Sequence, residues 1–471
     1  MNRRDILRRT ATAGLLATPA AGLLAGCATA GGGDKKDGDT YQGKKSEQNP
    51  LGVKEDAPLE VVIFNGGFGE EYAKAHEAMY QEKYPKAEIK HSATQEISKT
   101  LQPRFVDGTP PDVVNNSGAG QIDFNGLVSQ NAIADLGELL AAPSLDIPGK
   151  TVKDTLLPGT VEVGSYDGTF LVMNYTYTVY GIWHSTKLFA DRGWQYAKTW
   201  DDHIALCKQI KAAGIAPWTY AGLHPRYMSW PLISTAIKFG GPEVALAIDN
   251  LEPNAWKSDA MKSAADAWHQ IVKDKYILDG SPGLDHKQSQ TAWCQGKAAF
   301  ISCGSWLESE QADVTPDGFN MTVQPTPSLG SGDKLPFEAV RGTAGEPFMV
   351  PAKAKNVAGG LEFFRTMLSR KGAQDFTRKV ASLTVVQGAT EGVELPYGLN
   401  TVVKALDASG ANGFNWVYNN YYRKLERNLV DAACGEFFSG RIGPAEFLDQ
   451  CQRGADSIAQ DSSVKKYKRA A

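Results

Sequence analysis

The sequence has no excess of charge of either sign and few of the residues that usually bind metals. Lys and Arg number 49 against 53 Asp and Glu, and there are 7 histidines and 6 cysteines in 471 residues. Without a basic face, binding to nucleic acid has no support. Neither an H-E-x-x-H motif nor a C-x-x-C pair occurs, so the sequence predicts no metal site and no cofactor.

The motifs of common enzyme classes are also missing. No G-x-S-x-G nucleophile elbow is present. The segment NGGFGEE at 65–71 matches a dinucleotide-binding fingerprint only in part, because Tyr72 stands where the third glycine would be. Acidic pairs such as Asp201–Asp202 stand at expected helix starts, where the helix dipole favours them. We therefore predict that the protein is not an enzyme.

Beyond the N-terminus, no apolar run reaches the ~20 residues that a membrane-spanning helix needs. The N-terminus itself carries Arg3 and Arg4, then the weakly apolar ATAGLLATPAAGLLAG, then Cys27. This order is typical of an export signal, and the paired arginines fit the twin-arginine type. The residues LAGC at 24–27 resemble a lipobox, whose cysteine is acylated. An ordinary secretory signal with a chance cysteine is the alternative.

We expect residues 1–26 to be a twin-arginine lipoprotein signal. Acyl chains such as palmitate on Cys27 would anchor the chain at the extracellular face of the cell membrane. Residues 27–57 are rich in glycine and charge and poor in large apolar side chains, which predicts a disordered tether. The remaining roughly 400 residues exceed one hydrophobic core and indicate two or more domains.

The five other cysteines leave their pairing open. An exported chain permits disulfides. Cys434 and Cys451 flank an expected helical hairpin, and Cys294 and Cys303 bracket a helix end and a strand, so either pair could form a bridge. Cys207 lies on the apolar side of an expected helix and is interpreted as a buried free thiol.

Strands and helices alternate along the rest of the chain. The apolar, β-branched run LEVVIFN at 59–65 is typical of a buried parallel strand. A helix at 70–84, a strand at 87–93, a short helix at 98–108 and a strand at 110–118 follow. This βαβαβ order begins an open α/β sheet. Further on, 167–184 is extended, 199–214 is a helix capped by Thr199, and the chain from 401 is mostly helical.

Aromatic residues are plentiful, with 10 tryptophans and 17 tyrosines. Several follow expected strands, at the sheet edge where α/β proteins place their ligands. Sugars suit such places, because their apolar faces stack on aromatic rings while their hydroxyls need amide and charged partners. Any single ring could instead belong to the core, but the set favours a sugar-binding site.

Five segments, taken together, resemble the family 1 extracellular solute-binding proteins, the receptors of carbohydrate ABC importers. In chain order they are KYPKAEIK with VDGTPPDVV, DGTFLVMNYTYTVYGIWHSTKLFADRG, KTWDDHIALCKQIKAAGIAPW, GKAAFISCGSW and VPAKAKNVAGGLEFFRTMLS. They cover most of the chain from Leu59. Trp183 and His184 replace the family's usual Tyr-Asn, and Lys198 replaces a frequent proline.

The resemblance implies a periplasmic-binding-protein-like α/β fold, with two α/β lobes joined by a hinge and the ligand cleft between them. The N-terminal lobe would comprise 58–173 and 346–395, and the C-terminal lobe 174–345 and 396–471. The crossings would fall near Asn174, near Arg341–Gly345 and near Leu395. The lobes would close on the ligand by a hinge motion.

Within the family, the chain is most similar to actinobacterial lipoproteins that bind N-acetylglucosamine and diacetylchitobiose. The resemblance implies a monomer that delivers such sugars to the permease subunits of an ABC importer. A receptor for another oligosaccharide class is the alternative, as is an anchored glycoside hydrolase, which would need two carboxylates about 5–10 Å apart. The residues expected to bind ligand are Asn65, Phe68, Asn116, Tyr175, Tyr177, Tyr227, Trp306, Arg341 and Trp416.

The segment YMSWPLI at 227–233 resembles one in maltose-binding members of the family. The resemblance assigns Tyr227 to the ligand and Trp230 to packing within the lobe. It also makes Trp306 a stacking ring and places Tyr177 where those members carry an acid, which argues against a maltose-type hydroxyl clamp. We expect a helix to start here, with Ser229 as its cap and Pro231 in its first turn.

Overall fold

The computed structural model describes residues 40–118 and 120–469. The expected export signal with Arg3 and Arg4, and the expected acylation site Cys27, lie outside the described residues. Within the described ranges, no helix is long and apolar enough to cross a membrane.

The first half of the fold is the expected βαβαβ unit. Strand β1 (Leu59–Phe64) pairs in parallel with β2 (Ile89–Thr94) and with β3 (Val113–Asn115). The connecting helices are α1 (Glu71–Lys83) and α2 (Ile97–Val106). Val61, Val62 and Ile63 of β1 are all buried, as its continuous apolar run predicts.

Two long strands carry the sheet from this unit into the second half of the fold. Strand β10 (Arg341–Met349) runs antiparallel to β3 and along β6 (Met173–Ser185). The far half of β6 pairs with β8 (Ala298–Gly304) and β9 (Met321–Gln324), and β7 (Ala216–Thr219) pairs with β8. The sheet order is β2-β1-β3-β10-β6-β8-β7, with β9 on β6.

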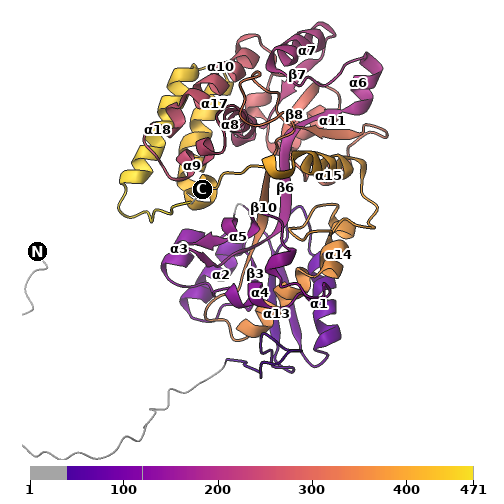
Figure 1. Cartoon of the computed structure of the whole chain (residues 1–471), viewed down its shortest axis with the longest axis vertical. Coiled ribbons are helices and arrows are strands. Elements are labelled where there is room, and N and C mark those ends of the chain that lie inside the picture. The colour runs from indigo at the N-terminus through magenta and orange to yellow at the C-terminus, as the bar shows by residue number, and fades with distance from the viewer. Residues whose placement is uncertain (1–39, 119, 470–471) are drawn as a thin grey trace, which may run out of the picture. The chain divides into compact units, whose positions relative to one another are not determined.

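Helices gather around both ends of this sheet (Figure 1). We call the part with α1, α2, α13 (Val357–Met367) and α14 (Arg370–Val380) the N-terminal lobe. The part with α7 (Trp200–Ala212), α8 (Arg226–Gly240), α10 (Asp259–Lys273), α17 (Asp431–Phe438) and α18 (Pro444–Gln460) is the C-terminal lobe. Strands β6 and β10 run between them. The lobe boundaries expected from the sequence, at 173/174, 345/346 and 395/396, stay a prediction.

The remaining helices and strands follow in chain order. They are α3 (Phe124–Ser129), α4 (Gly137–Ala141), η1 (Lys153–Thr155), α5 (Thr160–Val163), β4 (Ser165–Tyr166), β5 (Thr169–Phe170), α6 (Thr186–Arg192), α7 (Trp200–Ala212), α8 (Arg226–Gly240), α9 (Glu243–Asp249), η2 (Ala255–Lys257), α10 (Asp259–Lys273), η3 (Ser281–Gly283), α11 (His286–Cys294), α12 (Leu307–Glu310), α13 (Val357–Met367), α14 (Arg370–Val380), α15 (Tyr397–Ser409), η4 (Gly410–Asn412), α16 (Tyr418–Tyr421), η5 (Leu425–Val430), α17 (Asp431–Phe438) and α18 (Pro444–Gln460). The Thr199 side chain caps α7 by accepting from the Asp202 backbone N–H, as predicted.

Helix α8 begins earlier than expected. Its first turn forms at Pro225–Met228, where the Met228 N–H donates to the Pro225 carbonyl at 2.8 Å. Ser229 does not cap the helix, because its hydroxyl donates to the Arg226 carbonyl at 2.9 Å. Pro231 lies inside the helix, so the Tyr227 carbonyl loses the N–H partner that the position would normally supply.

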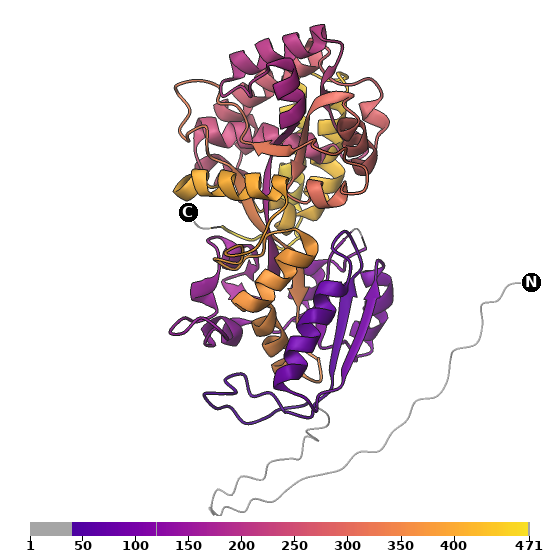
Figure 2. The ribbon, with the colours of Figure 1, turned by 90° about the vertical axis from the view of Figure 1, so that its right-hand side faces the viewer.

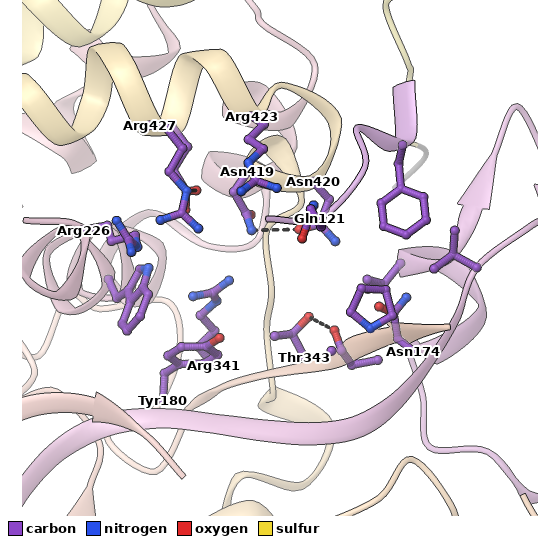
Figure 3. A pocket seen from close by; sticks show the side chains of 18 of the residues that line it. Gln121, Asn174, Tyr180, Arg226, Arg341, Thr343, Asn419, Asn420, Arg423 and Arg427 are labelled. Carbon is purple, nitrogen blue, oxygen red and sulfur yellow. Dashed lines mark hydrogen bonds and ion pairs between the residues drawn. The ribbon is translucent and has the colours of Figure 1, made fainter. Parts of the chain in front are cut away.

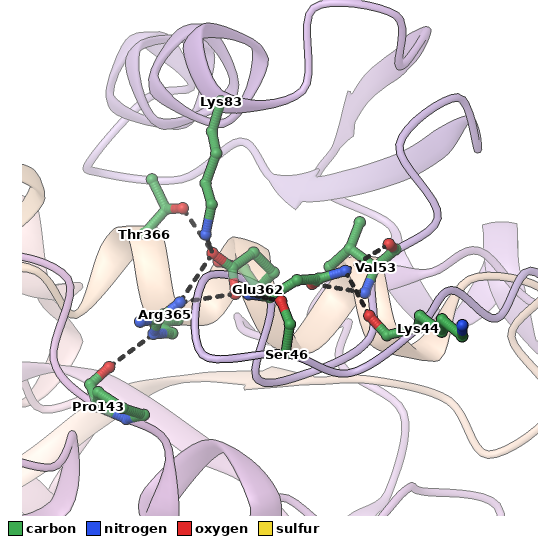
Figure 4. A network of polar contacts seen from close by, with 9 residues as sticks. Lys44, Ser46, Val53, Lys83, Pro143, Glu362, Arg365 and Thr366 are labelled. Atoms are coloured by element: carbon green, nitrogen blue, oxygen red, sulfur yellow. Dashed lines mark hydrogen bonds and ion pairs between the residues drawn. The ribbon is translucent and has the colours of Figure 1, made fainter.

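Residues 40–57 are folded, which corrects the expectation that the tether extends to 57. Leu51, Val53 and Ala57 are at most 2% exposed and belong to the core of the N-terminal lobe. Asn49 holds the segment by donating to the carbonyls of Lys44 and Val53 and accepting from the Val53 N–H (Figure 4). In Figure 2 the segment forms the indigo loop at the lower end of this lobe.

The same lobe is held by a buried charge network around Glu362 of α13 (Figure 4). Glu362 is fully buried and accepts from Lys83 of α1 at 2.7 Å and from Arg365 at 3.1 Å. Arg365 also donates to the Pro143 carbonyl at 2.7 Å. Removing one member of a buried pair typically costs about 3–5 kcal/mol, so this network fixes α1, α13 and the chain after α4 together.

None of the five cysteines among the described residues is paired, so neither expected bridge forms. The Cys434 thiol donates to the Pro225 carbonyl at 3.2 Å instead of meeting Cys451. Cys294 lies 3.8 Å from the Thr315 hydroxyl, and Cys303 accepts from Gln290 at 3.6 Å. All are buried, and burial raises the pKa of the Cys303 and Cys434 thiols well above the usual value, which makes them poor nucleophiles.

Candidate ligand-binding cleft

A cavity of about 370 Å³ lies where the two lobes meet, within the ~300–1,000 Å³ typical of small-molecule sites. The crossing strands β6 and β10 form its floor, and α8, the chain at Trp306 and the segment 419–427 form its C-terminal side (Figure 3). Its lining residues are Gln121, Asp123, Phe124, Val163, Tyr166, Val172, Asn174, Tyr180, Arg226, Tyr227, Trp230, Trp306, Arg341, Thr343, Ala344, Gly345, Pro347, Asn419, Asn420, Arg423, Glu426 and Arg427.

Four aromatic rings form one corner of the cavity. The centroid of Trp306 lies 5.5 Å from Tyr180 and 6.0 Å from Trp230, with its plane nearly perpendicular to both rings. Tyr227 packs on Trp230 at 4.5 Å. Rings at right angles present one face and one edge to the same space, an arrangement that can hold the apolar face of a sugar.

Local sequence explains how the corner is built. Tyr227 and Trp230 are three residues apart on α8, so both side chains lie on one face of the helix. Gly304 ends β8 directly beneath the Trp306 ring, where a Cβ atom would lie 2.2 Å from the indole. Glycine at this position therefore lets the tryptophan fold back over the strand.

Arg341 begins β10 and lies between two rings at the cavity wall. Its guanidinium carbon is 4.2 Å from the Tyr180 centroid and 3.7 Å from the Trp416 centroid. Its Nε donates to the Asn415 side chain at 3.2 Å. The side chain is buried, yet Nη1 has no hydrogen-bond partner in the part of the chain that the structure describes. Burial lowers the pKa of this guanidinium from its usual value.

Charged pairs line the opposite wall. Arg226 donates to Asp431 at 2.9 Å, and Arg427 pairs with Glu426 at 3.0 Å. Burial raises the pKa of the Glu426 carboxyl even with Arg427 beside it. Next to Arg427 in Figure 3, the Asn419 amide donates to Asn420 at 2.7 Å. The wall thus offers guanidinium and amide groups, the partners that sugar hydroxyls and carbonyls need.

Three of the nine predicted ligand residues line the cavity: Tyr227, Trp306 and Arg341. Trp230, which the sequence assigned to packing, lines it as well, although it is as buried as Tyr227. The helical spacing brings both rings to the same space, so the division of roles between them stays a prediction.

The other six lie outside this cavity. Asn65 is exposed beyond β1, and Phe68 packs on Phe376 at 5.7 Å. The Asn116 side-chain amide donates to the Ile122 carbonyl and accepts from the Ile122 N–H, so both of its polar atoms already have partners. Tyr175 is enclosed in the core, with its hydroxyl on the Met367 carbonyl, and Trp416 lies behind Arg341.

Strand register explains the positions of Tyr175 and Tyr177. Arg341 pairs with Tyr180 and Pro347 with Asn174, and all four line the cavity, so the even-numbered side of β6 faces it. Alternate residues of a strand point to opposite faces. Tyr175 and Tyr177 therefore point away from the cavity, and the Tyr177 ring packs on Gly342.

Sequence reasoning missed Tyr180, Arg226, Asn419, Asn420 and Arg427. Tyr180 could have been found from the alternation of side chains along β6, if one cavity-lining residue of that strand had been known. The others come from Asn419 onward and from α8, where no local pattern separates a lining residue from a surface one. Their convergence is a product of the tertiary fold.

The two carboxylates that line the cavity are already engaged. Asp123 caps α3 by accepting from the Gly126 N–H at 2.8 Å, and Glu426 is held by Arg427. A glycoside hydrolase needs one carboxyl group as acid and another as nucleophile or base. The engaged carboxylates of Asp123 and Glu426 therefore fit a binding site better than a hydrolase site.

Fold and cleft together define a two-lobed binding protein, and comparison with known proteins agrees. Residues 65–374 match the family described as bacterial extracellular solute-binding proteins. The chain belongs to that family, so it is a solute-binding protein and not an enzyme.

Among its relatives is the diacetylchitobiose binding protein NgcE of Streptomyces coelicolor, 34% identical over 98% of each chain. A probable sugar-binding periplasmic protein of Brucella suis is 24% identical over 46% of this chain and 48% of its own. These relatives place the chain among the sugar-binding proteins of ABC transporters.

Solved structures share the fold. RafE from Streptococcus pneumoniae, in its apo form, superposes with a TM-score of 0.68 at 17% identity, over 85% of this chain and 98% of its own. A chitin oligosaccharide binding protein superposes with a TM-score of 0.67 at 17% identity, over 86% of this chain and 99% of its own. The expected periplasmic-binding-protein fold is confirmed.

Proposed function

We propose that the protein captures N-acetylglucosamine and N,N'-diacetylchitobiose and delivers them to the permease subunits of an ABC importer. The observation that supports this ligand most directly is the 34% identity, over 98% of the chain, to a diacetylchitobiose binding protein. The aromatic corner of Tyr180, Tyr227, Trp230 and Trp306 beside guanidinium and amide groups is consistent with a sugar that carries both apolar methyls and carbonyls.

The ligand would be held by the cavity and enclosed by movement of the lobes. The proposed crossings are β6, β10 and the chain near Leu395, and closure about them would bring further residues to the sugar. The predicted residues Asn65 and Phe68 lie on the N-terminal lobe and are not buried, so closure could recruit them, whereas the buried Asn116 amide is already engaged by Ile122. Contact of Asn65 and Phe68 with ligand is part of this proposal.

The proposal also includes a monomer anchored by lipid at the extracellular face of the membrane. It is supported by Arg3, Arg4 and the LAGC sequence that ends at Cys27. Cells that express the full chain should incorporate a clickable palmitate analogue into the protein, and Cys27→Ser should abolish the label. Label retained in the variant would show that Cys27 is not the acylated residue.

Isothermal titration calorimetry tests the ligand. We expect saturable binding of N,N'-diacetylchitobiose and of N-acetylglucosamine, and none of maltose. Absence of heat with both N-acetylated sugars, in a protein that unfolds cooperatively on heating, would contradict the proposal. Binding of maltose alone would instead favour a receptor for another oligosaccharide class.

A further inference from the structure

We propose that Arg341 reads the acetamido group of the bound sugar, and that the cleft thereby rejects sugars whose acetamido group is replaced by a free amine. This inference rests on the proposed function and goes beyond it, because it assigns the choice between acetylated and deacetylated sugars to one side chain.

The position of Arg341 leaves donors of its guanidinium without a partner among the described residues. The rings of Tyr180 and Trp416 hold the guanidinium on two sides, and Asn415 accepts from Nε. Nη1 is buried and, among the described residues, has no acceptor. A buried donor without a partner is costly, so the site is built for an acceptor supplied by the ligand. An amide carbonyl oxygen is such an acceptor, whereas an ammonium group is only a donor.

The charge of the cavity works in the same direction. Its lining carries four arginines, at 226, 341, 423 and 427, against the carboxylates of Asp123 and Glu426. Figure 3 shows Arg226, Arg341 and Arg427 converging on one space. Arg226 and Arg427 are paired with acids, so the uncompensated charge is that of Arg341, and a protonated amine placed beside it would meet a like charge in a partly desolvated site, which disfavours binding.

An acidic sugar is the other ligand that arginines could recognise, and the pairing of the side chains disfavours it. Arg226 and Arg427 already contact Asp431 and Glu426, at 2.9 and 3.0 Å. A further carboxylate would have to lie beside these two acids. A neutral acceptor meets the free donor of Arg341 without that repulsion, so the observations favour the acetamide.

Calorimetry at pH 6 on the wild-type protein makes the first test. N,N'-diacetylchitobiose should bind at least about 100-fold more tightly than chitobiose, which carries two amines, because a site built around a hydrogen bond rejects the ligand that lacks it. The affinity for chitobiose should rise at pH 9, where its amines are neutral. Equal affinity for the two dimers, or a uronic-acid disaccharide that binds more tightly than either, would overturn the inference.

Two variants test the charge and the planar shape of the Arg341 guanidinium. Arg341→Gln should reduce the affinity for N,N'-diacetylchitobiose by about tenfold or more. The ratio of this affinity to the affinity for chitobiose should also become smaller. Arg341→Lys keeps the charge and a donor but loses the planar guanidinium that the two rings hold, so it should bind the diacetylated dimer with an affinity between those of wild type and Arg341→Gln and still reject chitobiose at pH 6. Arg192→Gln, at the exposed end of α6, is the matched control.

The outcomes distinguish the two proposals. If neither dimer binds to the folded wild-type protein, the proposed function fails and this inference fails with it. If both dimers bind and Arg341→Gln weakens them equally, the proposed function stands and the inference alone is wrong. The pH comparison uses only the wild-type chain, so it decides even if a variant does not fold.

Discussion

The guanidinium carbon of Arg341 lies 3.7 Å from the centroid of the Trp416 ring. Trp416 is 2% exposed and does not line the cavity, so we expect it to act on a ligand through Arg341. The contact joins the first residue of a crossing strand to the segment that leads into α16. It therefore links the cavity wall to the helical C-terminal part of the chain.

Replacing Trp416 with leucine should loosen Arg341 without removing a residue from the cavity. A buried cation–π contact is worth about 0.5–2 kcal/mol, so we expect diacetylchitobiose to bind roughly 2- to 30-fold more weakly. We would measure a double-mutant cycle by calorimetry. In the Arg341→Gln background, Trp416→Leu should change the affinity for diacetylchitobiose little further. Additive losses would mean that the tryptophan acts independently of Arg341.

Trp306 is only partly buried, unlike Tyr227 and Trp230, and is the expected stacking surface. Trp306→Ala should weaken binding by about 1–3 kcal/mol, by analogy with other ring-stacking sites. Trp194→Ala serves as the control, because Trp194 is also partly buried but packs on Phe189, away from the cavity. An unchanged affinity in Trp306→Ala would remove this ring from the site.

Gly304 can be tested separately from the ring it supports. In Gly304→Ala the added Cβ would lie 2.2 Å from the Trp306 indole, so the ring must shift. We expect the backbone at position 304 to stay paired with Tyr180. We expect an affinity loss of up to that of Trp306→Ala, about 1–3 kcal/mol, with the fold retained. Gly283→Ala, where the new methyl group meets no atom within 4 Å, should bind like wild type.

The sequence predicted the fold well because its strands and helices carry strong local patterns. The run LEVVIFN and the capped helix after Thr199 formed where expected. The site was harder to predict, because it depends on which face of β6 lines the cavity, and alternate residues of a strand point to opposite faces. In β6 the aromatic residues Tyr175 and Tyr177 drew attention, while the face that lines the cavity carries Tyr180.

Composition misled at residues 40–57. The glycines and charges of this segment suggested disorder, but a few buried apolar side chains and the Asn49 amide help to anchor it. Leu51 and Val53 fill the core of the N-terminal lobe, and Asn49 satisfies the backbone around them. Such anchoring depends on a complementary surface formed by distant residues, which no local window contains.

The cysteines offer a test that needs no ligand. Cys207, Cys294, Cys303, Cys434 and Cys451 are all unpaired, so alkylation of the denatured, unreduced protein should modify each of them. Peptide mass spectrometry identifies the modified positions. A native protein should react slowly, because all five thiols are buried. Protection of Cys434 and Cys451 together after denaturation would reveal a bridge that the structure lacks.

Glu346 should make the stability of the protein depend on pH. It lies in the crossing strand β10 with φ 54°, and its carboxylate accepts from Ser117 at 3.0 Å. Burial raises its pKa to about 7 from an ordinary value of 4.5. The folded form therefore holds this proton to a higher pH than the unfolded chain does. The contribution of Glu346 to the free energy of unfolding should fall as pH rises from about 4.5 to about 7.

The variant Glu346→Gln keeps the side-chain shape and removes the titration. We would measure melting temperatures by calorimetry between pH 4 and 8. The stability of Glu346→Gln relative to wild type should rise between about pH 4.5 and about 7 and should then stay constant. Glu47→Gln, at an exposed position, should follow wild type throughout. If Glu346→Gln runs parallel to wild type from pH 4 to 8, the carboxyl is not held protonated by the fold. The carboxyl would then be charged at any pH well above its ordinary pKa of 4.5, and hinge closure would gain no pH dependence from Glu346 near neutral pH.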